Sequence, residues 1–153
     1  MVLSTILLDA ASGVSNARRA VESLVQKMRH RKQNNLAKRA KRGFRGYPVA
    51  TIAVYGPSAE HASKVAVGIV EREGVEPEFL ETWHSEERDL RHDDEIGHKI
   101  VRFIREHQVM SVVMADRIIG CPHEEGIDYP LGESCPECPY WRGRDRWSGD
   151  LIN

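Results

Sequence analysis

Apolar residues recur at helical spacing over residues 14–42, near the start of the chain. One stripe consists of Ala17, Val21, Leu24 and Met28. Residues three, four or seven apart share one face of a helix, so this stripe predicts an amphipathic helix that begins at Ser15 or Asn16. Basic side chains fill the other faces, and Gly43, Gly46 and Pro48 punctuate the end. We therefore predict a basic helical N-terminal arm over residues 1–46.

The pattern over residues 47–119 alternates between strand and helix. The β-branched apolar runs predict strands at 49–56, 77–84 and 109–119. A helix is expected over 58–73, and a second helix is expected to begin at Asp93 or Asp94, with Ile96, Ile100, Phe103 and Ile104 on its inner face. Strands that alternate with helices in this order favour an α/β domain, here a small three-stranded parallel β-α-β-α-β sheet.

Residues 120–153 show no hydrophobic period and are rich in Gly and Pro. A segment with so little to bury needs a covalent or metal staple if it is to be ordered. All three cysteines of the chain fall here, and a Trp/Arg-rich tail follows them. The third region is therefore predicted to be a loop held by metal.

Charge divides the chain unevenly, although its net charge is only −1. Residues 1–45 carry eleven Lys or Arg and two acids, whereas residues 46–153 carry eleven Lys or Arg and twenty-one acids. A basic arm on an acidic body indicates contact with nucleic acid or with an acidic surface.

Hydropathy and cysteine content bear on the compartment. Hydrophobic residues make up 41% of the chain, but no apolar run reaches the length of about 18–20 residues that spans a bilayer. The apolar start has no Lys or Arg before Arg18, so a signal peptide is not expected. Three cysteines, two of them in a C-x-x-C pair, are a poor disulfide framework. We expect a cytoplasmic protein without a membrane segment.

The cysteines lie in the pattern C-x-H-x11-C-x2-C, formed by Cys121, His123, Cys135 and Cys138. The C-x2-C half is the usual zinc knuckle, and the other pair supplies one thiolate and one imidazole. A Cys3His set of soft and borderline ligands predicts a closed structural site for Zn²⁺. Two alternatives remain at this point: ordinary buried or free cysteines, and redox-active thiols.

The same loop also contains H-x-E at residues 123–125, ahead of its C-x-x-C. These residues resemble the H-x-E and P-C-x-x-C motifs of the zinc nucleoside and nucleobase deaminases. The resemblance implies zinc held by His123, Cys135 and Cys138, with Glu125 as the proton shuttle. The match departs from the family in three ways: only nine residues separate the two halves, Ser134 replaces the proline, and Cys121 is available as a fourth ligand.

Two segments are candidates for binding nucleic acid. The stronger is the arm, whose basic residues are Lys27, Arg29, Arg31, Lys32, Lys38, Arg39, Lys41, Arg42 and Arg45. The arm could instead dock on an acidic face or form a homodimer through its apolar stripe. The second segment is YWRGRDRW (140–147), where aromatics could stack on bases and arginines pair with phosphates, or where both could simply cover the metal loop.

Three weaker features complete the set of candidate sites. Gly56-Pro57-Ser58 precedes the helix expected at 58–73, where phosphate could bind, although a capped turn is the simpler interpretation. Residues 84–98 are rich in His and Asp, which indicates either a solvated loop or a second metal site. The metal loop follows a strand, so Glu124, Glu125, Asp128 and Tyr129 could line a cleft at the carboxyl edge of the sheet, although solvated polar groups of a loop are the simpler interpretation.

The leading functional hypothesis is a zinc-stabilised, non-enzymatic binding module that contacts nucleic acid or an acidic protein partner through its basic helix. One alternative is a small zinc-dependent enzyme, hydrolase or deaminase-like, with Glu125 as acid/base at the carboxyl edge of the sheet. The other is a dimeric regulatory or assembly protein that associates through the N-terminal helix.

Overall fold

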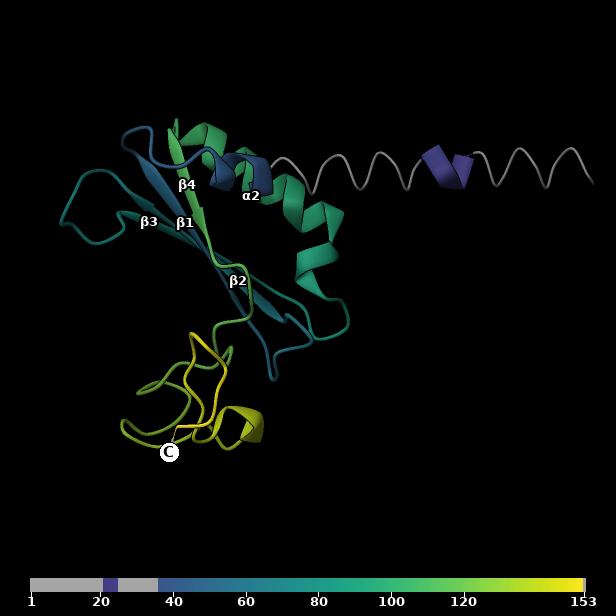
Figure 1. Cartoon of the computed structure of the whole chain (residues 1–153), viewed down its shortest axis with the longest axis vertical. Helices are drawn as coiled ribbons and strands as arrows, with labels where there is room; N and C mark the ends of the chain where they lie inside the picture. The colour runs from purple at the N-terminus through teal and green to yellow at the C-terminus, as the bar shows by residue number, and fades with distance from the viewer. Residues whose placement is uncertain (1–20, 25–35, 153) are drawn as a thin grey trace, which may run out of the picture.

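The structure is a computed structural model, and it describes residues 21–24 and 36–152. Residues 21–24 and 36–41 are helical, and the elements after them lie within one body (Figure 1). In chain order these are β1 (Val49–Tyr55), β2 (Lys64–Val70), β3 (Phe79–His84), the 3₁₀ turn η1 (Leu90–His92), α2 (Asp94–Glu106), β4 (Ser111–Met114) and the 3₁₀ turn η2 (Pro139–Trp141). No helix in these ranges combines the length and apolar character needed to cross a membrane.

The four strands form one mixed sheet in the order β3-β2-β1-β4. β1 pairs with β2, and β2 with β3, in antiparallel orientation, whereas β1 and β4 are parallel. The prediction of an α/β fold is confirmed, but the prediction of a three-stranded parallel sheet is wrong. The chain forms an antiparallel meander first, and only the crossover through α2 brings β4 back parallel to β1.

The error lies in the helix predicted over 58–73. Residues 56–63 form a turn and an extended connection, and β2 follows at Lys64–Val70. Five of the seven residues of β2 are buried, so the run has no alternation of apolar and polar positions. A short run of this kind resembles a buried helix in its periodicity, and only its β-branched residues and Gly68 favour a strand.

The two other predicted strands differ from the observed ones mainly in length. β3 occupies most of the predicted range 77–84, whereas β4 covers only four residues of the predicted range 109–119. The chain leaves the strand after Met114, and the next charged residues, Asp116 and Arg117, are exposed. It stays beside β1, where the Ala115 amide donates to the Ile52 carbonyl and the Ile119 amide donates to the Val54 carbonyl.

α2 begins where the sequence predicts it. The Asp93 carboxylate accepts hydrogen bonds from the amides of Glu95 and Ile96, which are free donors in the first turn of the helix. Ile96, Ile100 and Ile104 are buried, as their spacing predicts. They pack on the sheet together with alternate residues of the strands, including Ile52, Val67 and Val112.

The other face of the sheet carries the alternate residues. The in-register row Val113, Thr51, Gly68 and Leu80 lies on this face. Val113 is 59% and Leu80 67% exposed, so the middle of this face is open to solvent in the described part of the chain. At one end of the same face, Tyr55 pairs with Lys64 and Lys64 with His84, and here the C-terminal loop approaches the sheet.

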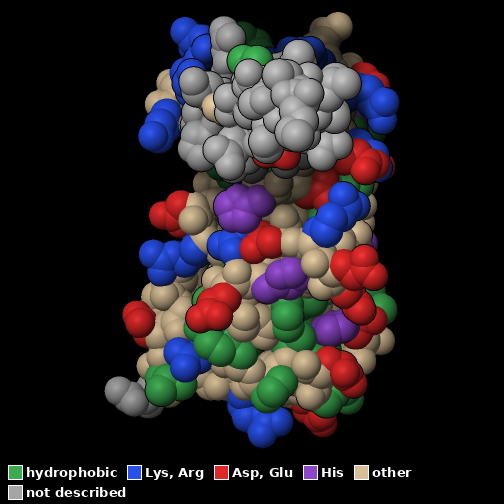
Figure 2. Space-filling view, turned by 90° about the vertical axis from the view of Figure 1, so that its right-hand side faces the viewer, with side chains coloured by type: hydrophobic (Ala, Val, Ile, Leu, Met, Phe, Trp, Pro, Cys, Tyr) green, Lys and Arg blue, Asp and Glu red, His purple; other side chains and the backbone are tan. Residues whose placement is uncertain are grey.

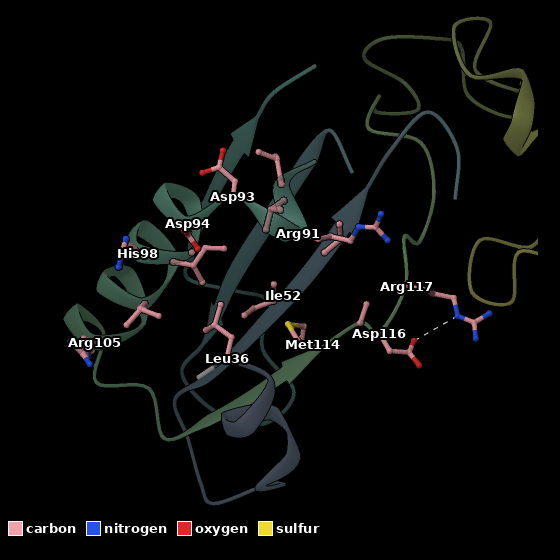
Figure 3. Close-up of a pocket in the computed structure, with 17 residues that line it drawn as sticks. Leu36, Ile52, Arg91, Asp93, Asp94, His98, Arg105, Met114, Asp116 and Arg117 are labelled. Atoms are coloured by element: carbon pink, nitrogen blue, oxygen red, sulfur yellow. Dashed lines mark ion pairs between the residues drawn. The ribbon is translucent and has the colours of Figure 1, made fainter. Parts of the chain in front are cut away.

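A hollow of about 400 Å³ lies between α2 and the sheet (Figure 3). Ile52 and Met114 form part of its floor, Leu36 closes one side, and α2 contributes residues such as Gly97 and Val101. The hollow exists because one helix of 13 residues cannot cover four strands. Leu36 and Ala40 pack against the core, so the helical residues 36–41 form its second, shorter wall.

Candidate metal centre and basic segment

The C-terminal loop is fixed to the ends of the strands through Gly56. The Gly56 amide donates to the Gly120 carbonyl at 2.9 Å, and its carbonyl accepts from Trp141 Nε1 at 2.8 Å. A Cβ at position 56 would clash with the carbonyl of His61, so the connection between β1 and β2 requires glycine here. The loop therefore lies where β1 ends and β2 begins (Figure 1).

Four side chains of this loop converge on one point. Nδ1 of His123 lies 3.2 Å from the sulfur of Cys121, 3.5 Å from that of Cys135 and 3.4 Å from that of Cys138. All four candidate ligand atoms lie within 4.8 Å of one another. The residues predicted from the C-x-H-x11-C-x2-C pattern are therefore close enough to hold a metal ion.

These distances match tetrahedral coordination. With metal–sulfur and metal–nitrogen distances of about 2.3 and 2.0–2.1 Å, a tetrahedral zinc site places sulfur and nitrogen about 3.5 Å apart. The three cysteines are buried, and His123 is half-buried. The His123 amide also lies 3.3 Å from the Cys121 sulfur, an N–H···S contact that stabilises a thiolate.

The electrostatics of the cluster call for a cation. Burial raises the pKa of the Cys138 thiol, and the neighbouring Cys121 and Cys135 raise it further. Burial also raises the pKa of Cys121, although the His123 amide acts in the opposite direction. A raised pKa favours the protonated thiol at Cys121 and Cys138, and a metal ion bound there would replace these protons and offset the repulsion between neighbouring thiolates.

Lys64 in β2 ties the metal loop to the sheet. Its side chain is only 9% exposed, and Nζ donates to the Pro122 carbonyl at 3.2 Å and to Glu124 Oε1 at 3.0 Å. Sequence analysis missed this residue because residues 58–73 were assigned to a helix. Within a strand, a lone cation at the start of a buried apolar run is the signal that could have identified it.

Glu125 is part of the loop scaffold. Its Oε1 accepts from the Gly132 amide at 2.5 Å, and the Gly126 amide donates to the Tyr129 carbonyl at 2.7 Å. The adjacent Glu124 amide is held by the Asp128 carboxylate. These hydrogen bonds close the stretch between the two ligand pairs. Glu125, the proton shuttle in the deaminase-like interpretation, therefore bonds to the backbone of its own loop.

A polar cleft of about 930 Å³ separates the metal loop from the open face of the sheet. It lies beside the ligands His123 and Cys138, and His61, His84 and Ser85 line its opposite side. Of the four loop residues considered for a cleft, Glu124 and Asp128 line it, whereas Glu125 and Tyr129 are not among its lining residues. The cleft lies beside a carboxyl strand end, but it is formed by β2, β3 and the loop rather than by parallel strands.

The His/Asp-rich stretch at 84–98 serves the fold. Asp89 caps η1 and holds Arg91 through several hydrogen bonds, while Asp93 caps α2. Within residues 21–24 and 36–152, the one group whose geometry could hold a metal is the Cys/His cluster. Ser58 accepts from the Glu60 amide within a turn, and no helix begins there, so the predicted phosphate site at a helix N-terminus does not form.

The tail segment 140–147 contains one tryptophan that packs against the metal loop and one that is exposed. Trp141 is half-buried and packs against both the core and the cysteine cluster, so it covers the metal loop. Arg144 lies over the Tyr140 ring at 4.5 Å and donates to the Gly149 carbonyl. Trp147 is 66% exposed.

The basic arm falls only partly within the described residues. Lys27, Arg29, Arg31 and Lys32 lie outside them, as do Ala17 and Met28 of the apolar stripe. Lys38, Lys41, Arg42 and Arg45 are exposed, and Arg39 is half-buried. On the face of the body in Figure 2, acidic, basic and histidine side chains are interspersed, without a field of one sign.

Comparison of the chain with protein-family models, curated proteins and solved structures gave no match. The fold and the site define the class of protein: a mixed α/β domain with a Cys3His cluster.

Proposed function

We propose that this protein is a zinc-stabilised binding module for nucleic acid, without a catalytic centre at its metal. The observation that carries the proposal is the convergence of three thiols and one imidazole nitrogen within 4.8 Å at the end of the sheet. A closed set of four protein ligands is typical of structural zinc, whereas catalytic zinc keeps one position for water.

Zinc is the ion that this ligand set suits best. Thiolates exclude the hard cations Mg²⁺ and Ca²⁺, which take oxygen ligands. The segment around the cluster contains exposed apolar residues such as Ile127 and Leu131, each 78% exposed, and has little core of its own. In this proposal the metal supplies the folding free energy that this segment lacks.

The nucleic-acid part of the proposal rests on charge. The first 45 residues carry eleven of the 22 basic side chains of the chain and only two acids. Where these residues are described, the long cations Lys38, Lys41 and Arg42 extend into solvent. Lys and Arg on one segment neutralise phosphates and release counterions, which supplies affinity without base contacts.

Native mass spectrometry and X-ray absorption test the metal. One zinc per chain is expected, with three sulfur ligands and one nitrogen ligand, and it should be lost in Cys135→Ser. An exchangeable oxygen in place of one protein ligand would support the alternative of a zinc enzyme instead. A folded protein that binds no metal would refute the proposal that zinc stabilises this module.

Anisotropy titrations with fluorescein-labelled oligonucleotides test the arm. The triple variant K38Q/K41Q/R42Q should bind more weakly. The salt slope, which is the slope of log K against log salt concentration, should decrease in magnitude by about 0.7–0.9 for each phosphate that the arm no longer neutralises. The variant R72Q/R102Q/R105Q removes three exposed body cations and the same net charge, and it should bind as the wild type does. Equally weakened oligonucleotide binding by both triple variants would show that binding depends on the net charge of the protein and not on the arm.

Self-association through the N-terminal helix is a second candidate function. It is favoured by Val21 and Leu24, which lie three apart on the helical segment 21–24 and are 59% and 60% exposed. Such a stripe is buried by a partner in a helical dimer. Light scattering on the wild type and on Leu24→Gln tests it: a dimer that becomes a monomer would support it, and a monomeric wild type would exclude it.

A further inference from the structure

A pair of aromatic rings, the exposed Phe44 and the half-buried Tyr47, lies among the cations at the end of the basic segment. Phe44 is 69% exposed, and its ring lies 5.4 Å from that of Tyr47 in an edge-to-face arrangement at 70°. The sequence around it is KRGFRGY, so Lys41, Arg42 and Arg45 flank the two rings, and all three are exposed. Apolar side chains that cluster within a rim of polar residues mark interaction surfaces.

The backbone beneath this pair is fixed. Ser111 at the start of β4 accepts a hydrogen bond from the Arg45 amide at 2.8 Å and donates one to the Gly46 carbonyl at 2.6 Å. The Met110 amide donates to the Pro48 carbonyl. Residues 45–48 are therefore anchored to β4, and the Phe44 side chain is exposed beside a fixed backbone.

Met110 extends the apolar surface beside the pair. A Cβ at Gly46 would lie 3.5 Å from the Met110 sulfur, so this side chain packs directly against the glycine. Met110 is itself 57% exposed. Phe44, Tyr47 and Met110 thus form a small apolar patch, which we call the aromatic patch. It lies at the opposite end of the sheet from the metal loop (Figure 1).

We propose that the aromatic patch stacks an unpaired base, so that the module selects single-stranded over double-stranded nucleic acid. This inference rests on the proposed function, because it names the kind of nucleic acid that the basic segment takes. Sites for single strands combine cations for the backbone with aromatic rings on which bases stack, and each stacked base contributes about 1–3 kcal/mol. In a duplex the base faces are already stacked and cannot reach Phe44.

The flanking arginines determine the geometry of this site. Arg45 is fixed at its amide by Ser111, so its guanidinium can meet a phosphate only within a limited distance of the Phe44 ring. A phosphate and a base of one nucleotide could then contact Arg45 and Phe44 together. Arginine suits this position because its planar fork binds phosphate through two hydrogen bonds.

The test uses the full zinc-bound chain with a labelled 20-mer of oligo-dT, and with a 20-base-pair duplex as the comparison. Phe44→Ala should weaken binding to the single strand by about 5- to 100-fold and leave duplex binding unchanged. Its salt slope should not change, whereas Arg45→Ala should lower the slope by about 0.7. Circular dichroism should show both variants folded.

Trp147→Ala is the matched control, because Trp147 is 66% exposed and also has arginine neighbours, but it belongs to the tail. It should bind as the wild type does. Equal weakening of strand and duplex by Phe44→Ala, or no weakening, would overturn the inference while the proposed function stands. Weaker binding in Trp147→Ala alone would move the stacking site to the tail and overturn it too. A wild type that binds no oligonucleotide would refute the proposed function and this inference together.

Discussion

Lys64 Nζ lies 3.0 Å from Glu124 Oε1, and this ion pair connects β2 to the first half of the metal loop. The lysine is almost fully buried, whereas the glutamate side chain is 58% exposed. The lysine also donates to the Pro122 carbonyl, one residue before the ligand His123. The position of the metal loop on the sheet therefore depends on a residue that binds no metal.

Lys64→Met should loosen the metal loop without releasing the metal. The substitution keeps the apolar stem but removes both hydrogen bonds, for an expected decrease of about 1–3 kcal/mol in the free energy of unfolding. Urea denaturation measures this decrease, and hydrogen exchange at residues 120–128 locates it. In Glu124→Gln the glutamine still accepts a hydrogen bond from Lys64, and the charge lost from the exposed Glu124 adds little to stability. This variant should lower the free energy of unfolding by under about 1 kcal/mol. Loss of zinc from Lys64→Met would contradict this role.

Trp141 should report on the metal. It contacts the cysteine cluster and the core, and its Nε1 donates to the Gly56 carbonyl at 2.8 Å. Removing the metal with a chelator should expose this indole and shift its emission to longer wavelength. The shift should vanish in Trp141→Phe and persist in Trp147→Phe, because Trp147 is already exposed. A spectrum that chelation leaves unchanged would mean that the loop is ordered without metal.

The Cys/His cluster could be predicted from sequence because its signal is local. Cys135 and Cys138 have the spacing of a zinc knuckle, and Cys121 and His123 supply the remaining pair in the same loop. α2 was equally predictable, since its cap Asp93 and its isoleucine stripe are contained in one short window. In both cases neighbouring residues alone determine the structure.

Strand pairing was not predictable in the same way. Five of the seven residues of β2 are buried, because α2 and the core cover one face and the metal loop reaches Lys64 on the other, and neither neighbour is visible in the sequence of β2 itself. The error at β2 then changed a meander into a parallel sheet and hid Lys64. The placement of Phe44 also depends on a distant partner, because Ser111 holds the backbone of the adjacent Arg45 and Gly46 from 65 or more residues away.

Asp89 should make stability depend on pH in the acid range. Burial alone would raise the pKa of Asp89, but the hydrogen bonds and charge of Arg91 outweigh it and lower the pKa to about 2. A carboxyl with a lowered pKa stabilises the fold fully above its unfolded value, near 3.8, and loses this contribution as the pH falls toward 2. The contribution is about 1–2 kcal/mol.

Asp89→Asn isolates this contribution, because the asparagine side chain can still accept a hydrogen bond from the Arg91 amide but carries no charge. The variant should be less stable than the wild type at neutral pH, and the difference should disappear between pH 4 and pH 2. Chemical denaturation of both proteins across this range measures it. The metal ligands are unchanged in the variant, so their protonation cancels in the comparison. A difference that is constant with pH would assign the effect to packing instead.

Gly97 lies inside α2, where replacement by alanine should stabilise the protein. A Cβ at this position would meet no atom within 4 Å, because it would point toward the hollow between α2 and the sheet. Glycine in a helix interior costs about 0.5–1 kcal/mol relative to alanine, since the unfolded chain loses more entropy. Gly97→Ala should therefore raise the free energy of unfolding by that amount, as measured in urea.

Gly74 provides the matched control for this substitution. A Cβ there would also meet nothing within 4 Å, but φ is +75°, a conformation that alanine adopts only at a cost. Gly74→Ala should therefore destabilise the turn between β2 and β3 by about 1 kcal/mol. Opposite signs for two glycines with equal space would show that backbone conformation, and not crowding, decides the outcome. Destabilisation by Gly97→Ala would instead mean that the hollow beside α2 is occupied and has no room for a methyl group.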